Sequence, residues 1–166
     1  MFSQGEVCRQ MFYIEKGLVR IFYNSNSGKE ITTWFSKENT FITSIDSFYQ
    51  HKATQYNCEL LEDSVIYSIS YSDLETLIKN RHDVAILAFR ISIEITQKMS
   101  EFMTSVKFQT AEERNKSMIQ KYPSIFQRAA LGHIASYLGI TQETLSRVRA
   151  AKRFPKSILF DRNYAV

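Results

Sequence analysis

Short stretches in which apolar and polar residues roughly alternate fill the first 71 positions of the chain. The clearest are residues 11–15 (MFYIE), 18–23 (LVRIFY) and 29–35 (KEITTWF), and they are rich in aromatic and β-branched side chains. Turn-forming residues separate them, as in Lys16-Gly17 and NSNSG at 24–28. This pattern is typical of strands, and two more are expected at 55–61 and 64–70. Several short strands joined by turns predict an antiparallel barrel or jelly roll.

A helical period replaces this alternation after residue 71. Ser72 and Glu75 have the spacing of a capping box, which predicts a short helix. Asp83 is a candidate cap for the next helix, which is expected to reach about Val106 because neither Gly nor Pro interrupts it. At a rise of about 1.5 Å per residue, such a helix would span roughly 36 Å.

Apolar residues form two stripes on this long helix. Ile86, Phe89 and Ile93 make up the shorter stripe, which is expected to rest on the barrel. The longer stripe has the spacing that a partner helix covers. Its members are Ile91, Ile95, Met99, Phe102 and Val106. An apolar stripe is usually just core, but two of them are hard to bury within one chain, so we predict a symmetric helix–helix dimer.

Residues 131–150, LGHIASYLGITQETLSRVRA, have the pattern of two helices joined by a tight turn. Gly139 stands at the corner, where a positive φ is expected, and Thr141 is a good N-cap for the second helix. A third helix should precede them, opened by a capping box at Thr110 and Glu113 and ended before Pro123. The apolar or small residues in register around the corner are Ile134, Ala135, Leu138, Ile140, Leu145 and Val148.

The second of these helices keeps a polar face above its apolar underside. Such a helix can enter the major groove of DNA, so we predict a DNA-reading helix-turn-helix. The predicted DNA-binding residues are Thr141, Gln142, Glu143, Thr144, Ser146, Arg147 and Arg149. The alternative is an ordinary helical corner with a solvated face. Residues 151–166 show no hairpin pattern, so no wing is predicted.

Charge is distributed unevenly along the chain. Residues 1–106 carry 10 Lys and Arg against 13 Asp and Glu, whereas residues 107–166 carry 11 against 4. A basic C-terminal part favours the phosphate backbone of double-stranded DNA as its partner, although an incidental basic surface would give the same count.

Features that the sequence lacks limit the cellular compartment and the chemistry that we expect for this protein. Two distant cysteines, no evident signal peptide and no long apolar run predict a cytoplasmic protein without a membrane partner. No GxSxG, HExxH, P-loop or CxxC motif occurs, so no enzyme, no catalytic residue and no metal site is predicted. His51, His82 and His133 are scattered, whereas a metal needs converging donors. A small-barrel enzyme of the cupin type would need clustered His and Glu on strands, and the sequence has no such cluster.

The order of barrel, long striped helix and helix-turn-helix resembles the Crp/Fnr family of bacterial transcription regulators. FYIEKGLVRIFY and GKEITTWF look like hairpins of that family's cyclic-nucleotide-binding barrel, and residues 111–150 look like its DNA-binding domain. The resemblance implies a homodimer with recognition helices about 34 Å apart. It assigns base reading to Gln142, Glu143 and Arg147; Arg147 could contact guanine and Glu143 could contact cytosine. RNA polymerase is a further candidate partner.

Two features depart from the family pattern. Family members usually have a helix and a strand before the match to GEVCRQMFYIEKG, so a chain that starts at Met1 would have an open barrel edge. Members that bind cyclic nucleotides use a Gly-Glu pair and an Arg, but Thr43 and Ser44 stand at the Gly-Glu place and no Arg lies between Arg20 and Arg81. Cyclic nucleotide binding is therefore expected to be lost.

The prediction is an α+β protein in three parts. Residues 1–82 form a cyclic-nucleotide-binding-like jelly roll (a double-stranded β-helix), residues 83–107 the dimerisation helix, and residues 108–166 the helix-turn-helix domain. The predicted function is DNA-binding regulation by a homodimer, with no cofactor and an unknown small-molecule effector. The residues of the candidate effector loop are Thr43, Ser44, Lys52 and Thr54. The alternative is an effector-binding barrel whose helical tail contacts other proteins.

Overall fold

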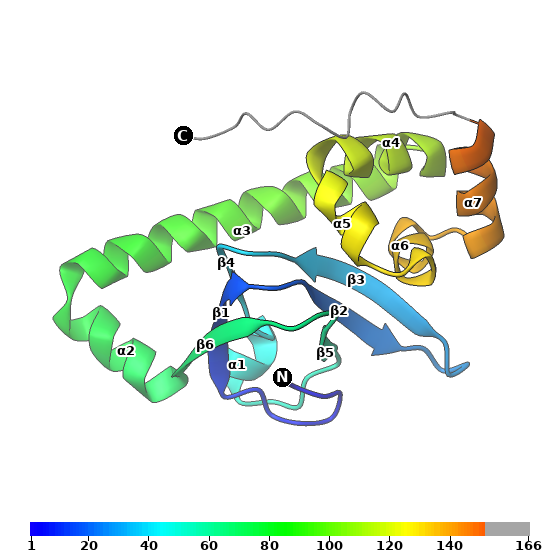
Figure 1. Ribbon diagram of the computed structural model, residues 1–166. Coiled ribbons are helices and arrows are strands. Elements are labelled where there is room, and N and C mark those ends of the chain that lie inside the picture. Colours follow the sequence, from blue (N-terminus) through cyan, green and yellow to red (C-terminus); the bar gives the residue numbers. More distant parts are fainter. Residues whose placement is uncertain (152–166) are drawn as a thin grey trace.

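The computed structural model describes residues 1–151, and for residues 111 and 148–151 it describes the backbone alone. Strands come first and a row of helices follows, with one short helix inserted among the strands (Figure 1). The strands are β1 (Gln10–Lys16), β2 (Val19–Asn24), β3 (Glu30–Ser36), β4 (Thr40–Ile42), β5 (Asn57–Leu60) and β6 (Val65–Ser70). The helices are α1 (Ile45–Gln50), α2 (Tyr71–Asn80), α3 (His82–Phe108), α4 (Ala111–Lys121), α5 (Pro123–Arg128), α6 (Leu131–Leu138) and α7 (Gln142–Ala151).

The strands form two antiparallel sheets, in the orders β4-β1-β6 and β3-β2-β5. Between β1 and β2 the chain passes from one sheet to the other through Gly17, whose φ is +125°. A Cβ at Gly17 would overlap the Ser64 side chain, so glycine alone fits there. The sequence-predicted strands are confirmed to within two residues, whereas β4 and α1 were not predicted. No ladder joins the two sheets within residues 1–151, so of the predicted barrel or jelly roll the structure shows two antiparallel sheets and no closed barrel.

Apolar side chains from both sheets share one core. Its members are Phe2, Cys8, Phe12, Ile14, Val19, Ile42 and Cys58. Burial raises the pKa of the Cys58 thiol to about 12, so this cysteine behaves as a small apolar side chain. The core holds the sheets together without closing them.

Helix α2 begins earlier than the sequence predicted. Its N-cap is Ser70, whose hydroxyl accepts the Asp73 N–H at 3.1 Å. The prediction of a capping box at Ser72 and Glu75 is therefore wrong by two residues. Helix α3 likewise begins at His82 without a side-chain cap, and Asp83 forms an ion pair with Arg81 instead.

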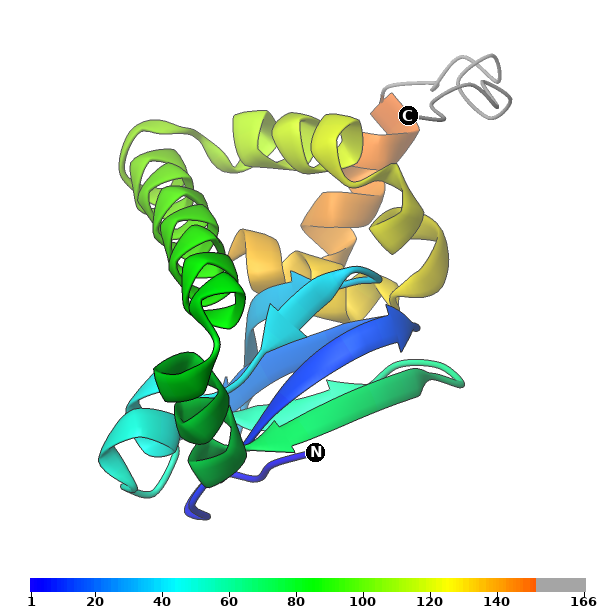
Figure 2. The same cartoon turned by 90° about the vertical axis from the view of Figure 1, so that its left-hand side faces the viewer.

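Helix α3 spans 27 residues, or about 40 Å, and runs past the sheets on one side (Figure 2). Its two apolar stripes are not divided between the sheets and solvent as predicted. Phe102 and Ile95 face the chain's own sheet, and the Phe102 ring lies 5.7 Å from that of Trp34. Phe89 is 66% exposed, so it does not rest on the sheets. Sequence spacing identified both stripes, but only the tertiary packing decides which of them the chain covers itself.

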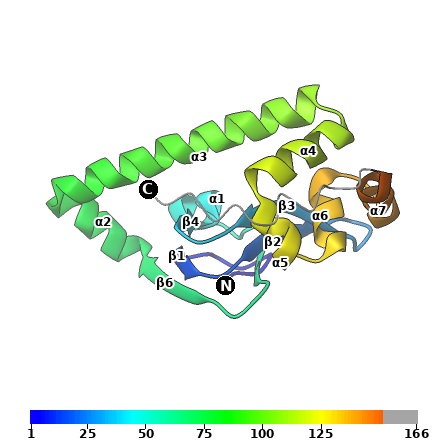
Figure 3. The same cartoon turned by 45° about the horizontal axis from the view of Figure 1, so that its top comes forward.

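A second core joins the C-terminal helices to the sheets. Leu18 and Phe35 from the sheets pack with Met118 of α4 and Ile125 of α5, and with buried residues of α6 and α7. Viewed from above, these helices gather at one end of α3 and over β3 (Figure 3). The predicted capping box at Thr110 and Glu113 is confirmed, and α4 ends before Pro123 as predicted.

Among the described helices, none combines the length and apolar character needed to cross a lipid bilayer.

Leu138→Ala should destabilise the fold. Leu138 is 1% exposed in the core that α6 shares with α7, so its truncation leaves a cavity. We expect the free energy of unfolding, measured by urea denaturation, to fall by about 2–5 kcal/mol. Leu87→Ala on α3 is the control, because the Leu87 side chain is 52% exposed, and a change of about 0.5 kcal/mol or less is expected. Equal effects of the two substitutions would contradict the assigned core.

Candidate nucleic-acid interface

The turn between α6 and α7 is fixed by Gly139. Its φ of 69° and ψ of 30° are left-handed. The Ile140 N–H donates to the Ala135 carbonyl at 3.0 Å, and the Gly139 N–H donates to the Ser136 carbonyl at 3.1 Å. These two bonds form a Schellman motif, which satisfies the last carbonyls of α6. The positive φ predicted at Gly139 is confirmed.

Helix α7 starts after Thr141, as predicted. The Thr141 hydroxyl accepts the Thr144 N–H at 3.1 Å, which is the hydrogen bond of an N-cap. Leu145 is fully buried beneath α7, beside Ile134 and Leu138 of α6. The apolar underside of α7 is thus packed against α6, and this packing fixes which face of α7 points outward. The side chain of Val148, also predicted to be buried, lies outside the described part of the chain.

The outward face of α7 carries most of the predicted DNA-binding residues. Thr144 is half-buried, and the Arg149 side chain lies outside the described part of the chain. The exposed members are Thr141, Gln142, Glu143, Ser146 and Arg147. Hydrogen-bonding side chains of these types can reach base edges in a major groove.

Glu143 is held in its ionised form at the start of α7. Backbone N–H donation, followed by a hydrogen bond with Thr141, lowers the pKa of this carboxyl group. The positive end of the helix dipole has the same tendency. An ionised Glu143 can only accept hydrogen bonds, which suits the amino group of a cytosine and disfavours a phosphate.

Arginines fasten the C-terminal helices to the rest of the chain. Arg128, at the end of α5, lies 2.6 Å from a Glu38 carboxylate oxygen and also donates to Glu62, so it spans two turns of the sheets. The side-chain hydrogen bond from Arg128 lowers the pKa of Glu38 to about 2. Arg114 donates to the backbone carbonyls of Gln109 and Leu138, at 2.7 and 3.0 Å, and thereby joins the α3–α4 linker to the end of α6.

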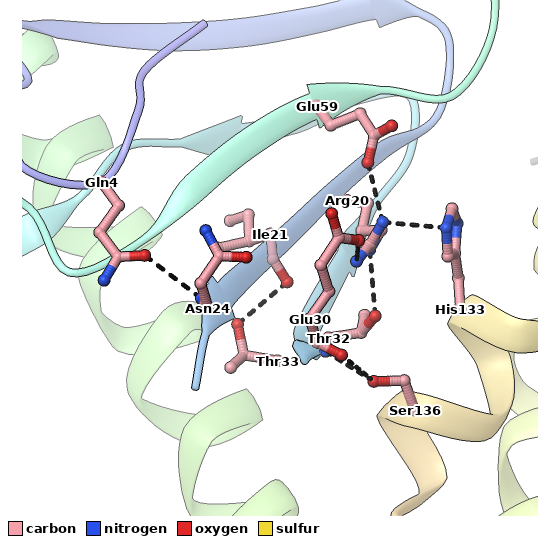
Figure 4. A network of polar contacts seen from close by, with 10 residues as sticks. All are labelled: Gln4, Arg20, Ile21, Asn24, Glu30, Thr32, Thr33, Glu59, His133 and Ser136. Carbon is pink, nitrogen blue, oxygen red and sulfur yellow. Dashed lines mark hydrogen bonds and ion pairs between the residues drawn. The ribbon is translucent and has the colours of Figure 1, made fainter. Parts of the chain in front are cut away.

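Helix α6 also contacts the sheets directly, through polar side chains (Figure 4). The Thr32 N–H of β3 donates to the Ser136 hydroxyl at 3.0 Å, and that hydroxyl donates to the Glu30 carbonyl at 3.1 Å. His133 lies 2.9 Å from Arg20, a guanidinium that is only 2% exposed. We call this set of residues the α6–β3 contact; its members are Arg20, Glu30, Thr32, His133 and Ser136.

The candidate effector loop bonds to its own chain. Ser44 and Thr54 are buried, with their hydroxyl oxygens 2.8 Å apart, and the Thr43 hydroxyl donates to the Gln10 carbonyl at 2.9 Å. Ser47, on the unpredicted helix α1, is fully buried and accepts the Cys8 N–H at 2.7 Å. Lys52 is exposed. The side chains of Ser44 and Thr54 therefore bond to each other, whereas Thr43 bonds to Gln10 and Lys52 is exposed.

Sequence reasoning missed the residues of the α6–β3 contact. His133 was noted only as one of three scattered histidines, and Arg20 only as the last arginine before a long gap. The one local signal was a charged residue in the middle of an apolar strand. Its partners lie between 10 and 113 positions away, a separation that no local period reveals.

Known proteins resemble both the first part of this chain and the chain as a whole. Residues 1–81 match the family model described as cyclic nucleotide-binding domain. The chain is 26% identical to the regulatory protein HlyX of Actinobacillus pleuropneumoniae over 168 residues, covering 95% of this chain and 68% of HlyX. FixK2 of Bradyrhizobium japonicum superposes with a TM-score of 0.73 at 18% identity, covering 91% of this chain and 78% of FixK2.

A CRP-family transcriptional regulator of Thermus thermophilus has the same architecture. It superposes with a TM-score of 0.71 at 16% identity, covering 99% of this chain and 84% of that regulator. At these identities the structural likeness establishes a shared fold, in which antiparallel sheets precede a long helix and a C-terminal group of helices.

Proposed function

Because the chain belongs to the Crp/Fnr family of regulators, with a cyclic nucleotide-binding domain at residues 1–81, we propose that it is a DNA-binding transcriptional regulator that acts as a homodimer. In this proposal residues 1–82 form the sensing part, 83–107 the dimerisation helix and 108–166 the DNA-binding part. The matched relatives are regulatory proteins, which agrees with a role other than catalysis. RNA polymerase is a further candidate partner.

The single observation that carries the proposal is the outward polar face of α7. Leu145 anchors α7 against α6, while Gln142 and Arg147 remain exposed. A helix held in this way can place its N-terminal half in a major groove, with the turn at Gly139 setting its angle to α6. The basic excess after residue 106 would attract the phosphate backbone.

Dimerisation is assigned to the exposed stripe of α3. Phe89, Ile93 and Met103 are 66%, 45% and 69% exposed. Met99 and Val106 of the originally predicted stripe are exposed as well, whereas Ile91, Ile95 and Phe102 are half-buried. A second copy of α3 would cover the exposed apolar side chains and place two α7 helices symmetrically.

Loss of cyclic nucleotide binding follows from the chemistry of the loop before β5. A cyclic phosphate needs converging N–H groups and a bidentate guanidinium. In this loop Ser44 and Thr54 bond to each other, and the single ammonium group, on Lys52, is exposed. The effector, if there is one, is of another chemical class.

An effector-binding module with a protein-interaction tail is the alternative. It would leave the polar face of α7 without a nucleic acid partner and would require a ligand in the sheets. Selection of bound fragments from genomic DNA with the purified protein separates the two functions. An inverted repeat with half-sites about one helical turn apart supports the dimeric regulator, and no enriched sequence supports the alternative.

Arg147→Ala should weaken binding to the selected site by about 1–3 kcal/mol and relax base preference at one position. Fluorescence anisotropy on matched and mismatched duplexes measures both effects. Arg90→Ala, an exposed arginine on α3, is the charge-matched control and should leave affinity unchanged. Equal weakening on all sequences would make Arg147 a phosphate contact. A flat dependence of affinity on salt would argue against DNA as the partner.

Phe89→Asp should convert the dimer to a monomer, because a carboxylate would have to be buried in the helix pair. Light scattering measures the mass. Leu87→Asp is the control, since two residues along a helix place Leu87 on the other side of α3. A dimeric Phe89→Asp variant would show that the interface lies elsewhere.

Cyclic AMP and cyclic GMP should give no saturable heat in a calorimetric titration of the purified protein. The physical reason is the missing guanidinium and the internally bonded loop hydroxyls. A dissociation constant in the micromolar range or lower would contradict the proposed loss of binding.

A further inference from the structure

We propose that the α6–β3 contact is a proton-sensitive latch, which holds α6 on the sheets while His133 is neutral and loosens when His133 takes up a proton. The inference concerns the position of α6 and does not require α7 to read DNA. Its consequence for DNA binding rests on the proposed function.

The neutral state of His133 follows from its partner. A guanidinium has no acceptor, so Nη1 of Arg20 must donate to Nε2 of His133, at 2.9 Å. A histidine that accepts through Nε2 carries its proton on Nδ1 when neutral. The other hydrogen of the same Arg20 nitrogen goes to Glu59, also at 2.9 Å. His133 therefore completes the set of acceptors around this nitrogen.

Protonation would replace the hydrogen bond by a repulsion. The imidazolium would present a donor to a donor and a positive charge to a positive charge, at a site where Arg20 is shielded from water. The charged groups that face His133 are Arg20 from β2, Glu30 from β3 and Glu59 from β5. Both carboxylates pair with Arg20, at 2.5 and 2.9 Å, and they attract the imidazolium, but burial and the charge of Arg20 outweigh this attraction.

The contact also holds a polar atom that favours opening. Nδ1 of His133 is buried and has no hydrogen-bond partner among the described residues. On the other side of α6, an open cleft between α3 and α4 is bordered by Trp34 of β3 and by Tyr137 and Leu138 of α6. A buried polar atom without a partner reduces the stability of the docked arrangement.

The direction of the pH dependence follows from the position of His133. Burial, and then the charge of Arg20, hold the pKa of His133 below its ordinary value, while Glu59 and Glu30 act in the opposite direction. The released histidine, with a pKa of about 6.5, therefore binds a proton more readily than the docked one. Docking is complete above that value and weakens as the pH falls below it.

Two native groups report on the latch without a label. Trp34 is the single tryptophan of the chain and lies against Phe102 and the cleft that α6 borders. The Thr32 amide donates to Ser136 of α6, so its hydrogen-exchange protection measures docking directly. Between about pH 7.5 and about pH 5.5, we expect a red shift of Trp34 emission and a fall of more than about tenfold in Thr32 protection, with unchanged far-ultraviolet circular dichroism.

His133→Gln decides the proposal. The glutamine amide oxygen can accept from Arg20 but cannot titrate, so this variant should stay docked at both pH values. His133→Lys should resemble the low-pH state at both. His51→Gln and His82→Gln are the controls, because these are the other two histidines and both are exposed; they should respond as the natural sequence does.

A pH response that persists in His133→Gln would overturn the proposal, and so would the absence of any response in the natural sequence. Both measurements use the full chain without DNA. A chain that shows the response but binds no DNA would retain the latch and lose the proposed regulatory function, so the two failures are distinguishable.

Discussion

A guanidinium removed from water has to be satisfied on every side, and the arrangement of this protein depends on how Arg20 achieves it. Its nitrogens donate to Thr32, Glu30, Glu59 and His133, and its Cζ atom lies 4.0 Å from the centroid of the Phe22 ring. Removal of one acceptor from a buried charge is far more costly than loss of a surface ion pair. Because one acceptor comes from α6, the sheets are fully satisfied only when α6 is docked on them. The position of the C-terminal helices is thus coupled to the interior of the N-terminal part.

Other contacts also hold the C-terminal helices on the sheets, but they differ in how they depend on pH. The core shared by Leu18, Phe35 and the C-terminal helices has no direction and no dependence on charge, so it sets how strongly the parts adhere. The pairs of Arg128 with Glu38 and Glu62 stay ionised throughout the neutral range, because the pKa of both carboxyls is lowered. Within this interface His133 is the group whose ordinary pKa lies near neutrality. In the proposed latch, the residues that hold the helices on the sheets therefore differ from the residue that makes this contact depend on pH.

Features encoded locally could be predicted from the sequence. The hairpin strands, the left-handed Gly139, the Thr141 cap and the capping box at Thr110 each depend on residues within a few positions of one another. Features set by distant contacts could not. The periodicity of α3 showed two apolar stripes but not which one the sheets cover, and Phe102 proved to pack on Trp34. Arg20 and His133 are 113 positions apart, and no period connects them. The candidate DNA-reading face was accessible to sequence reasoning because it lies on one helix, whereas the contact that positions that helix was not.

The hydrogen bond between Ser44 and Thr54, in the loop before β5, bears on whether an effector binds in that loop. A phosphate that used the hydroxyls of Ser44 and Thr54 would compete with the hydrogen bond that they make to each other. Hydroxyls paired in a buried site stabilise one arrangement of the loop, and a ligand that binds another arrangement would have to break this pair. A switch requires an element with two states of similar free energy. The α6–β3 contact has a titratable partner for Arg20 and an Nδ1 atom that is unpaired among residues 1–151, which are the features of such an element. The proposed regulatory input is therefore placed at this contact.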